Sequence, residues 1–252
     1  MGFYQLSKEE RQQKVAEINE AVLDGLLTGR DDKLIAYFSD EDTYIRKTAY
    51  LAVGKIYKTN EGLRHAILHV LDTLFKHDSE KVRQTAINVA GEIGMTDFAP
   101  IECLMEQGLF DEHHSVRNAV IGSIKKMGEK NPEPVLAFAR CFLHHEDKEI
   151  RREICHGIEL RGRTHPQDIL PLLKELEHDK TARVRNTLVH VLGQISYKKG
   201  CLATVIAHLK TWQNAEVIKK ALEEIIDVHD RYKDFAVLTK AQAKAYIDAH
   251  YY

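Results

Sequence analysis

The sequence predicts an all-α fold: a right-handed α-solenoid of about six helix pairs, closed at both ends by a capping helix. Three observations support this prediction. The chain of 252 residues has only 5 prolines and 14 glycines and is rich in residues that favour helices. A short motif returns at a constant interval. After each copy of that motif, apolar residues follow the period of an α-helix.

The motif consists of an acidic or amide residue, a short polar gap, a β-branched residue and an arginine, and an apolar helix follows. Its arginines are Arg46, Arg83, Arg117, Arg151 and Arg185, and a degenerate sixth copy ends at Lys219. The first interval is 37 residues and the next four are 34 residues each. Such equal spacing indicates a structural repeat, in which stacked units share one continuous core.

Each repeat has room for two helices of about 12–14 residues and two turns. The second helix, here called helix B, follows the arginine. In the fifth copy its apolar residues are Val184, Leu188, Leu192 and Ile195, at steps of 4, 4 and 3 that fall on one helical face. The first helix, helix A, is predicted at 63–75, 132–143 and 169–176, among others.

The ends of a repeat stack need atypical elements with a polar outer side. The segment 1–30 is predicted to hold an N-terminal capping helix at 7–28, and 231–252 a C-terminal one at 239–250. Thr239 and Gln242 have the spacing of a capping box. Residues 31–230 then carry the repeats, and 1–252 is predicted to be a single solenoid domain.

The ValArg and IleArg dipeptides, the Ala and Gly positions after them and the LeuGlyGlnIle run at 192–195 resemble HEAT repeats of the short bacterial kind, an ARM-type fold. The resemblance covers roughly 31–230. It implies that the five motif arginines form a structural ladder, each pairing with an acidic loop residue of a neighbouring repeat. The predicted partners are Asp42, Asp78, Asp111, Asp147 and Asp179.

Charge and composition narrow the range of functions. The formal net charge is -2, which gives no overall attraction to nucleic acid or to an anionic membrane. There is no stretch of membrane-spanning length, no signal-like N-terminus and no paired-cysteine motif. We therefore expect a cytoplasmic monomer with no cofactor and no membrane association.

The best candidate binding surface is the polar face of helix B, expected to line the concave side of the solenoid. Its rows at one, five, eight and twelve residues after the arginine sum to a charge of +3. Amides and histidines there make directional hydrogen bonds. The predicted partner-binding residues are Lys47, Asn88, Asn118, Arg152, His156, Asn186, His190 and Lys220.

No catalytic motif stands out, and no catalytic or metal-binding residue is predicted. His156 and His190 occupy equivalent positions in neighbouring repeats, so their rings should lie close together, but the sequence shows no clear set of further ligands. On the polar rows the aromatic candidate is Tyr197, and the carboxylates are Glu159 and Glu224.

Two functions remain open. The first is a non-enzymatic interaction module that holds a protein or peptide partner in its concave groove. The second is a DNA-binding protein, because 170–212, with its ValArg and its Trp212, resembles the HEAT-like DNA alkylation-repair glycosylases. That family implies a positive cleft with aromatic residues and a catalytic carboxylate. The resemblance does not map this carboxylate onto a specific residue of the chain.

Overall fold

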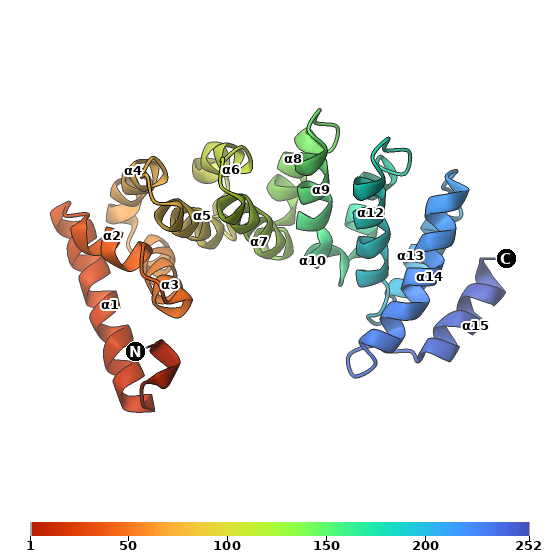
Figure 1. Cartoon of the computed structure of the whole chain (residues 1–252), viewed down its shortest axis with the longest axis horizontal. Coiled ribbons are helices and arrows are strands. Elements are labelled where there is room, and N and C mark those ends of the chain that lie inside the picture. Colours follow the sequence, from red (N-terminus) through yellow and green to blue (C-terminus); the bar gives the residue numbers. More distant parts are fainter. Residues whose placement is uncertain (1, 252) are drawn as a thin grey trace. The chain divides into compact units, whose positions relative to one another are not determined.

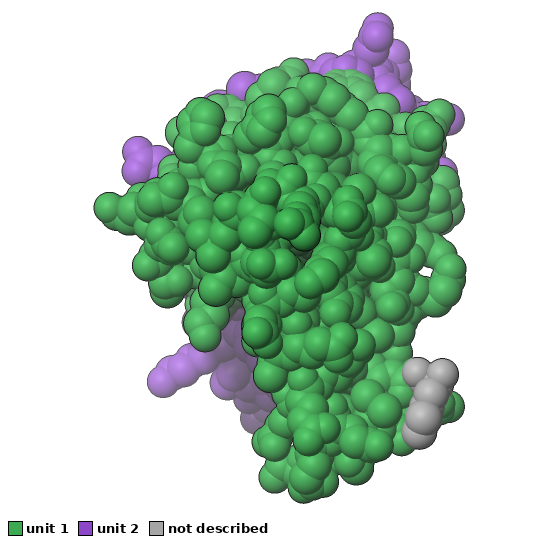
Figure 2. Space-filling view, turned by 90° about the vertical axis from the view of Figure 1, so that its left-hand side faces the viewer, with its two compact units in different colours: residues 1–131 green, residues 132–252 purple. Residues whose placement is uncertain are grey.

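A computed structural model describes residues 2–251, and every regular element in that range is a helix. The chain divides into two compact units, residues 1–131 and 132–252 (Figure 2). Each unit contains three helix pairs, and the second helices of consecutive pairs pack side by side within each unit. The predicted all-α solenoid of helix pairs is therefore confirmed.

Unit 1 begins with a long capping helix that packs on the first pair (Figure 1). Its elements are η1 (Phe3–Gln5), α1 (Lys8–Thr28), α2 (Asp32–Phe38), α3 (Thr43–Thr59), η2 (Glu61–Leu63), α4 (Arg64–Phe75), α5 (Glu80–Gly94), η3 (Ala99–Ile101), α6 (Glu102–Leu109) and α7 (His114–Lys130). The B helices are α3, α5 and α7, and each packs against the next.

Unit 2 repeats this plan and ends in a capping helix that packs on its last pair. Its elements are α8 (Pro132–Phe142), α9 (Lys148–Gly157), α10 (Glu159–Gly162), α11 (Pro166–Lys174), α12 (Ala182–Gln194), α13 (Cys201–Leu209), α14 (Ala215–Arg231) and α15 (Lys240–His250). The B helices α9, α12 and α14 stand in order in Figure 1. A single residue, Ile158, separates α9 from α10, which the repeat pattern did not predict.

Two features of the sequence pattern are confirmed: the predicted start of α15 and the predicted buried face of α12. The side chain of Thr239 accepts a hydrogen bond from the Gln242 N–H, completing the predicted capping box of α15. Val184, Leu188 and Leu192 of α12 and Ile195, its C-cap residue, are fully buried. Because no helix pair covers its own apolar surface, stacking on the next pair supplies the core.

Close packing between B helices depends on glycine. A Cβ built at Gly91 of α5 would lie 2.7 Å from Cβ of Ser123 on α7, and one at Gly193 of α12 would lie 2.6 Å from Cγ of Glu224 on α14. Gly54 meets Glu92 in the same way. The row eight residues after the arginine was predicted to be part of the exposed strip. Its glycines are instead buried between helices, because the B helices approach too closely there for a side chain.

Two arginines of the ladder join consecutive repeats through buried bidentate pairs. Nε and Nη2 of Arg83 donate to the carboxylate of Asp111 at 2.8 and 3.1 Å, and those of Arg151 donate to Asp179 at 2.6 and 3.2 Å. Each carboxylate belongs to the following repeat. The Nη1 groups donate to carbonyls in the arginine's own loop, such as Asp78 O at 2.9 Å. One guanidinium thus fixes a helix, its own loop and the next loop.

The other ladder arginines also bind loop carbonyls. Nη1 of Arg46 donates to Asp40 O, that of Arg117 to Asp111 O and that of Arg185 to Asp179 O, at 2.5 to 2.6 Å. The carboxylate of Asp42, a predicted arginine partner, accepts hydrogen bonds from the N–H groups of Phe3 and Tyr44 instead.

Replacing Gly91 with alanine should destabilise the protein, since the new methyl group overlaps Ser123 on the adjacent helix. We expect a loss of about 1–3 kcal/mol in the free energy of unfolding, measured by urea denaturation. Gly122→Ala on α7 is the matched control because a Cβ there meets nothing within 4 Å. It should be neutral or stabilising by up to about 1 kcal/mol through helix propensity. Equal effects at the two positions would contradict this account of the packing.

Removing Arg151 should leave the carboxylate of Asp179 buried without its main partner. Arg151→Ala is expected to lower the free energy of unfolding by about 3–5 kcal/mol. Arg140→Ala, which breaks an exposed pair with Glu175, should cost at most about 1 kcal/mol. Urea denaturation at neutral pH compares the two, and a similar cost for both would show that the ladder is not a structural constraint.

The same pair predicts an acid dependence. Burial acts to raise the pKa of Asp179, but hydrogen bonds from Arg151 and from the Thr181 N–H outweigh it and hold the pKa below the ordinary 3.8. The pair's stabilisation is therefore complete above that value and is lost as the pH falls through the lower pKa of the folded state. Asp179→Asn should flatten this acid limb of unfolding free energy against pH, and an unchanged limb would contradict the assignment.

Candidate functional site

Four predicted strip residues meet in one shallow pocket of unit 2. Arg152 and His156 come from α9, and Asn186 and His190 from α12. Arg183 and Thr187 of α12 complete the lining of a space of about 310 Å³. The equivalence of positions in neighbouring repeats brings these residues together, because α9 and α12 pack side by side.

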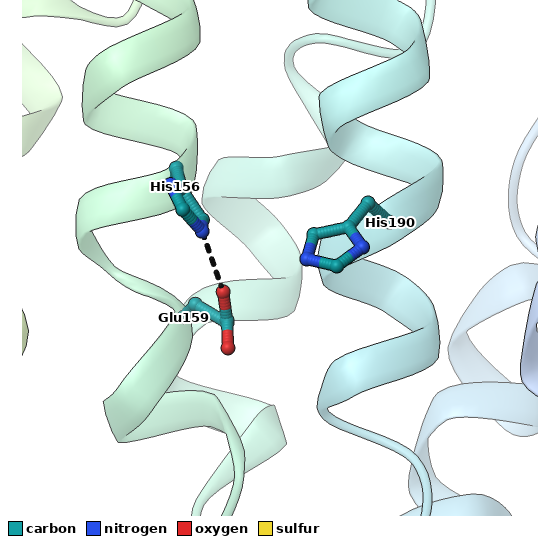
Figure 3. Close-up of side chains that lie close together, drawn as sticks. All are labelled: His156, Glu159 and His190. Atoms are coloured by element: carbon teal, nitrogen blue, oxygen red, sulfur yellow. Dashed lines mark ion pairs between the residues drawn. The ribbon is translucent and has the colours of Figure 1, made fainter. Parts of the chain in front are cut away.

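The two histidines of the pocket flank a buried carboxylate. The rings of His156 and His190 lie 5.9 Å apart, and Nε2 of His156 lies 3.1 Å from Oε2 of Glu159. One ligand-type atom from each of the three residues falls within 4.8 Å of the others. Figure 3 shows both rings with a nitrogen facing Glu159. The sequence placed Glu159 on the strip without joining it to the histidines, although its position three residues after His156 was a usable signal.

Glu159 is the anionic centre of this cluster. Its exposed fraction is 1%, and its other oxygen, Oε1, accepts hydrogen bonds from Nε and Nη2 of Arg163. Nη2 of Arg163 also donates to Oε1 of Gln194 at 3.0 Å. A buried carboxylate needs such a partner to remain charged. Arg163 therefore holds one oxygen of Glu159 and leaves the other directed at His156.

His190 is held from its far side. Its Nδ1 lies 3.7 Å from Oε1 of Glu224 on α14, and Glu224 in turn accepts two 3.3 Å hydrogen bonds from Arg231. In Figure 3 the remaining ring nitrogen faces the cluster. At 3.7 Å Nδ1 and the Glu224 oxygen are too far apart for a hydrogen bond, but the nearby carboxylate favours a proton on Nδ1.

The rim of the pocket is close to charge balance. Glu149 lies between two arginines, with Arg152 Nε at 2.9 Å and Arg183 Nη1 at 3.0 Å. Arg152 also lies 3.4 Å from the buried Glu153. Sequence reasoning did not select Arg183 or Thr187, because Arg183 precedes the first counted row and Thr187 lies between the first two. The rim offers hydrogen-bond donors without a strong positive field.

The other four strip residues do not line this pocket. Lys220 lies exposed on α14 and pairs with Glu216 at 2.7 Å. In unit 1, Lys47 and Asn118 are exposed, and the amide of half-buried Asn88 donates to the Gln84 carbonyl of its own helix.

The aromatic candidates are packed away from the surface. Tyr197, predicted on an exposed row, is buried and stacks on Tyr232 with ring centroids 5.4 Å apart. Tyr197 lies three residues beyond the end of α12, so a projection of that helix does not predict the direction of its side chain. Trp212 is also buried and donates from Nε1 to Nδ1 of His208 at 2.9 Å, which makes it a packing residue.

Comparison with known proteins supports the fold. No protein-family model matches the sequence, and no curated protein matches it either. Among solved structures, AlkD2 from Streptococcus mutans is similar, with a TM-score of 0.54 and 18% identity over 88% of this chain and 100% of that one.

An archaeal HEAT-like repeat protein from Thermococcus onnurineus has a TM-score of 0.40 at 16% identity, over 86% of this chain and 97% of that one. The match to AlkD2, at 18% identity, shows a shared helical-repeat fold and nothing about activity. Within residues 2–251, no helix combines the length and the apolarity that a membrane span needs.

Proposed function

We propose that this protein is a non-enzymatic interaction module that binds a protein or peptide partner on the helix-B face of unit 2. The observation that carries the proposal is the pocket between α9 and α12. It collects hydrogen-bonding side chains from equivalent positions of neighbouring repeats, namely Arg152, His156, Arg183, Asn186, Thr187 and His190.

The chemistry of this pocket suits a polar peptide segment. The exposed amide of Asn186 has both donors and an acceptor, the pattern that pairs with a peptide group. The guanidinium groups of Arg152 and Arg183 add donors for backbone carbonyls or for an acidic side chain. Since Glu149 and the buried Glu153 together offset their charge, recognition here depends on hydrogen-bond direction more than on a general attraction to anions.

The alternative proposal is DNA binding of the alkylation-repair type, and the structural similarity to AlkD2 is the reason to test it. A duplex binder is expected to neutralise about 6–10 phosphates, and a base-excising site needs stacked aromatic rings beside a carboxylate. In this chain Tyr197 and Trp212 are buried, and Glu159 is engaged by Arg163. These features favour the peptide-binding proposal.

Selection from a peptide library against the full chain tests the proposal, followed by titration of the selected peptides against variants. Asn186→Arg places a bulky side chain in the pocket and should weaken binding at least about tenfold, or by 1.4 kcal/mol or more. The matched control is Ala203→Arg. Ala203 is exposed on α13, the first helix of the last pair, and this change should leave the affinity unchanged.

Two results would contradict the proposal. One is an equal loss of binding in both variants. The other is failure to select any peptide while an abasic-site duplex binds tightly with a steep salt dependence, which would favour the DNA-binding alternative. In that second case Arg152→Glu with Lys220→Glu should abolish duplex binding.

A further inference from the structure

We infer that His156, Glu159 and His190 form a binding site for a divalent transition metal, with Zn²⁺ as the best-fitting ion. The inference goes beyond partner binding and does not rest on it. Its basis is the arrangement in Figure 3, where two imidazole nitrogens face one buried carboxylate oxygen from two neighbouring repeats. Two histidines and a glutamate are a ligand set that zinc accepts in proteins.

The spacing of the ligand atoms fits a tetrahedral ion. Ligands about 2.0–2.1 Å from a tetrahedral zinc lie roughly 3.4 Å from one another. Nε2 of His156 and Oε2 of Glu159 are already 3.1 Å apart. The remaining separations are at most 4.8 Å. Closing the site needs the widest of these separations to shorten by at most about 1.4 Å, and the side chain of His190 is half-exposed at the pocket surface.

The surroundings orient two of the three ligands. Arg163 binds Oε1 of Glu159, and Oε2 lies on the side of His156, 3.1 Å from its Nε2. Glu224 lies 3.7 Å from Nδ1 of His190 and favours a proton on that nitrogen, and the other ring nitrogen lies on the side of Glu159 (Figure 3). Arg231 fixes Glu224 in turn. Metal-ligating histidines typically donate from their second nitrogen to a carboxylate.

The site differs from a simple histidine–glutamate contact elsewhere in the chain. His144 Nε2 lies 2.8 Å from Oε2 of Glu175, but His144 is exposed and Glu175 only half-buried, and no second histidine joins them among the described residues. In the proposed site the carboxylate is buried and a second histidine faces it from the adjacent helix. Three protein ligands leave a fourth position on an ion, which a water molecule or an acidic group of a partner can fill.

The test is a Zn²⁺ titration of the full chain by calorimetry, with Co²⁺ as a spectroscopic probe of tetrahedral coordination. A Cys103→Ser and Cys141→Ser background removes the two exposed thiols, which are alternative zinc ligands. We expect one ion per chain, a Tm that rises with Zn²⁺ concentration, and a Co²⁺ spectrum of tetrahedral type. His190→Ala should weaken Zn²⁺ binding at least about tenfold.

His144→Ala is the matched control and should bind Zn²⁺ like the parent. Circular dichroism confirms the fold of each variant, and His156→Gln, which keeps a hydrogen-bonding group near Glu159, provides a second ligand removal. Parent-like Zn²⁺ affinity in both His190→Ala and His156→Gln would overturn the inference. So would the absence of stoichiometric binding at micromolar Zn²⁺ in the parent.

Discussion

The buried pairing of an arginine on one repeat with an aspartate on the next is the constraint on which the rest of this structure depends. Arg83 with Asp111 and Arg151 with Asp179 each connect a B helix to its own loop and to the following loop. A bidentate pair tolerates little sliding. At these two junctions, α5 with α7 and α9 with α12, the B helices are therefore held in one register, and residues at equivalent repeat positions are brought side by side.

This register explains both the packing and the site. Glycines fall where adjacent B helices touch, as at Gly91 and Gly193. Glu159 follows His156 by three residues. Glu224 occupies the position in the sixth repeat that is equivalent to His156 and His190. The pocket is thus a consequence of the repeat: side chains from two neighbouring copies face each other across one helix contact.

The sequence predicts most of the fold because its information is periodic. The 34-residue interval, the arginine motif and the apolar face of helix B locate the helix pairs, and Thr239 with Gln242 locates the start of α15. Equivalent positions also predict that His156 and His190 meet. The repeat interval and helical geometry were sufficient to predict the helix pairs and the proximity of the two histidines.

What sequence reasoning missed depends on contacts between helices. The row of Gly54 and Gly91 reads as exposed on an isolated helix and becomes buried only when the next helix packs there. Tyr197 lies past the end of α12, where a helical projection no longer holds. The role of Glu159 depends on its burial between helices, which spacing does not show, although its pairs with His156 and Arg163 have ordinary helical spacing.

The central claim is that equivalent positions on neighbouring B helices act as one site. Nuclear magnetic resonance of the imidazole rings during a Zn²⁺ titration tests it most directly, because the chain's 14 histidines report individually. The account predicts that the ring resonances of His156 and His190 shift together at one equivalent of ion while that of His144 stays in place. Independent shifts of His156 and His190, or a first response at another histidine, would contradict it.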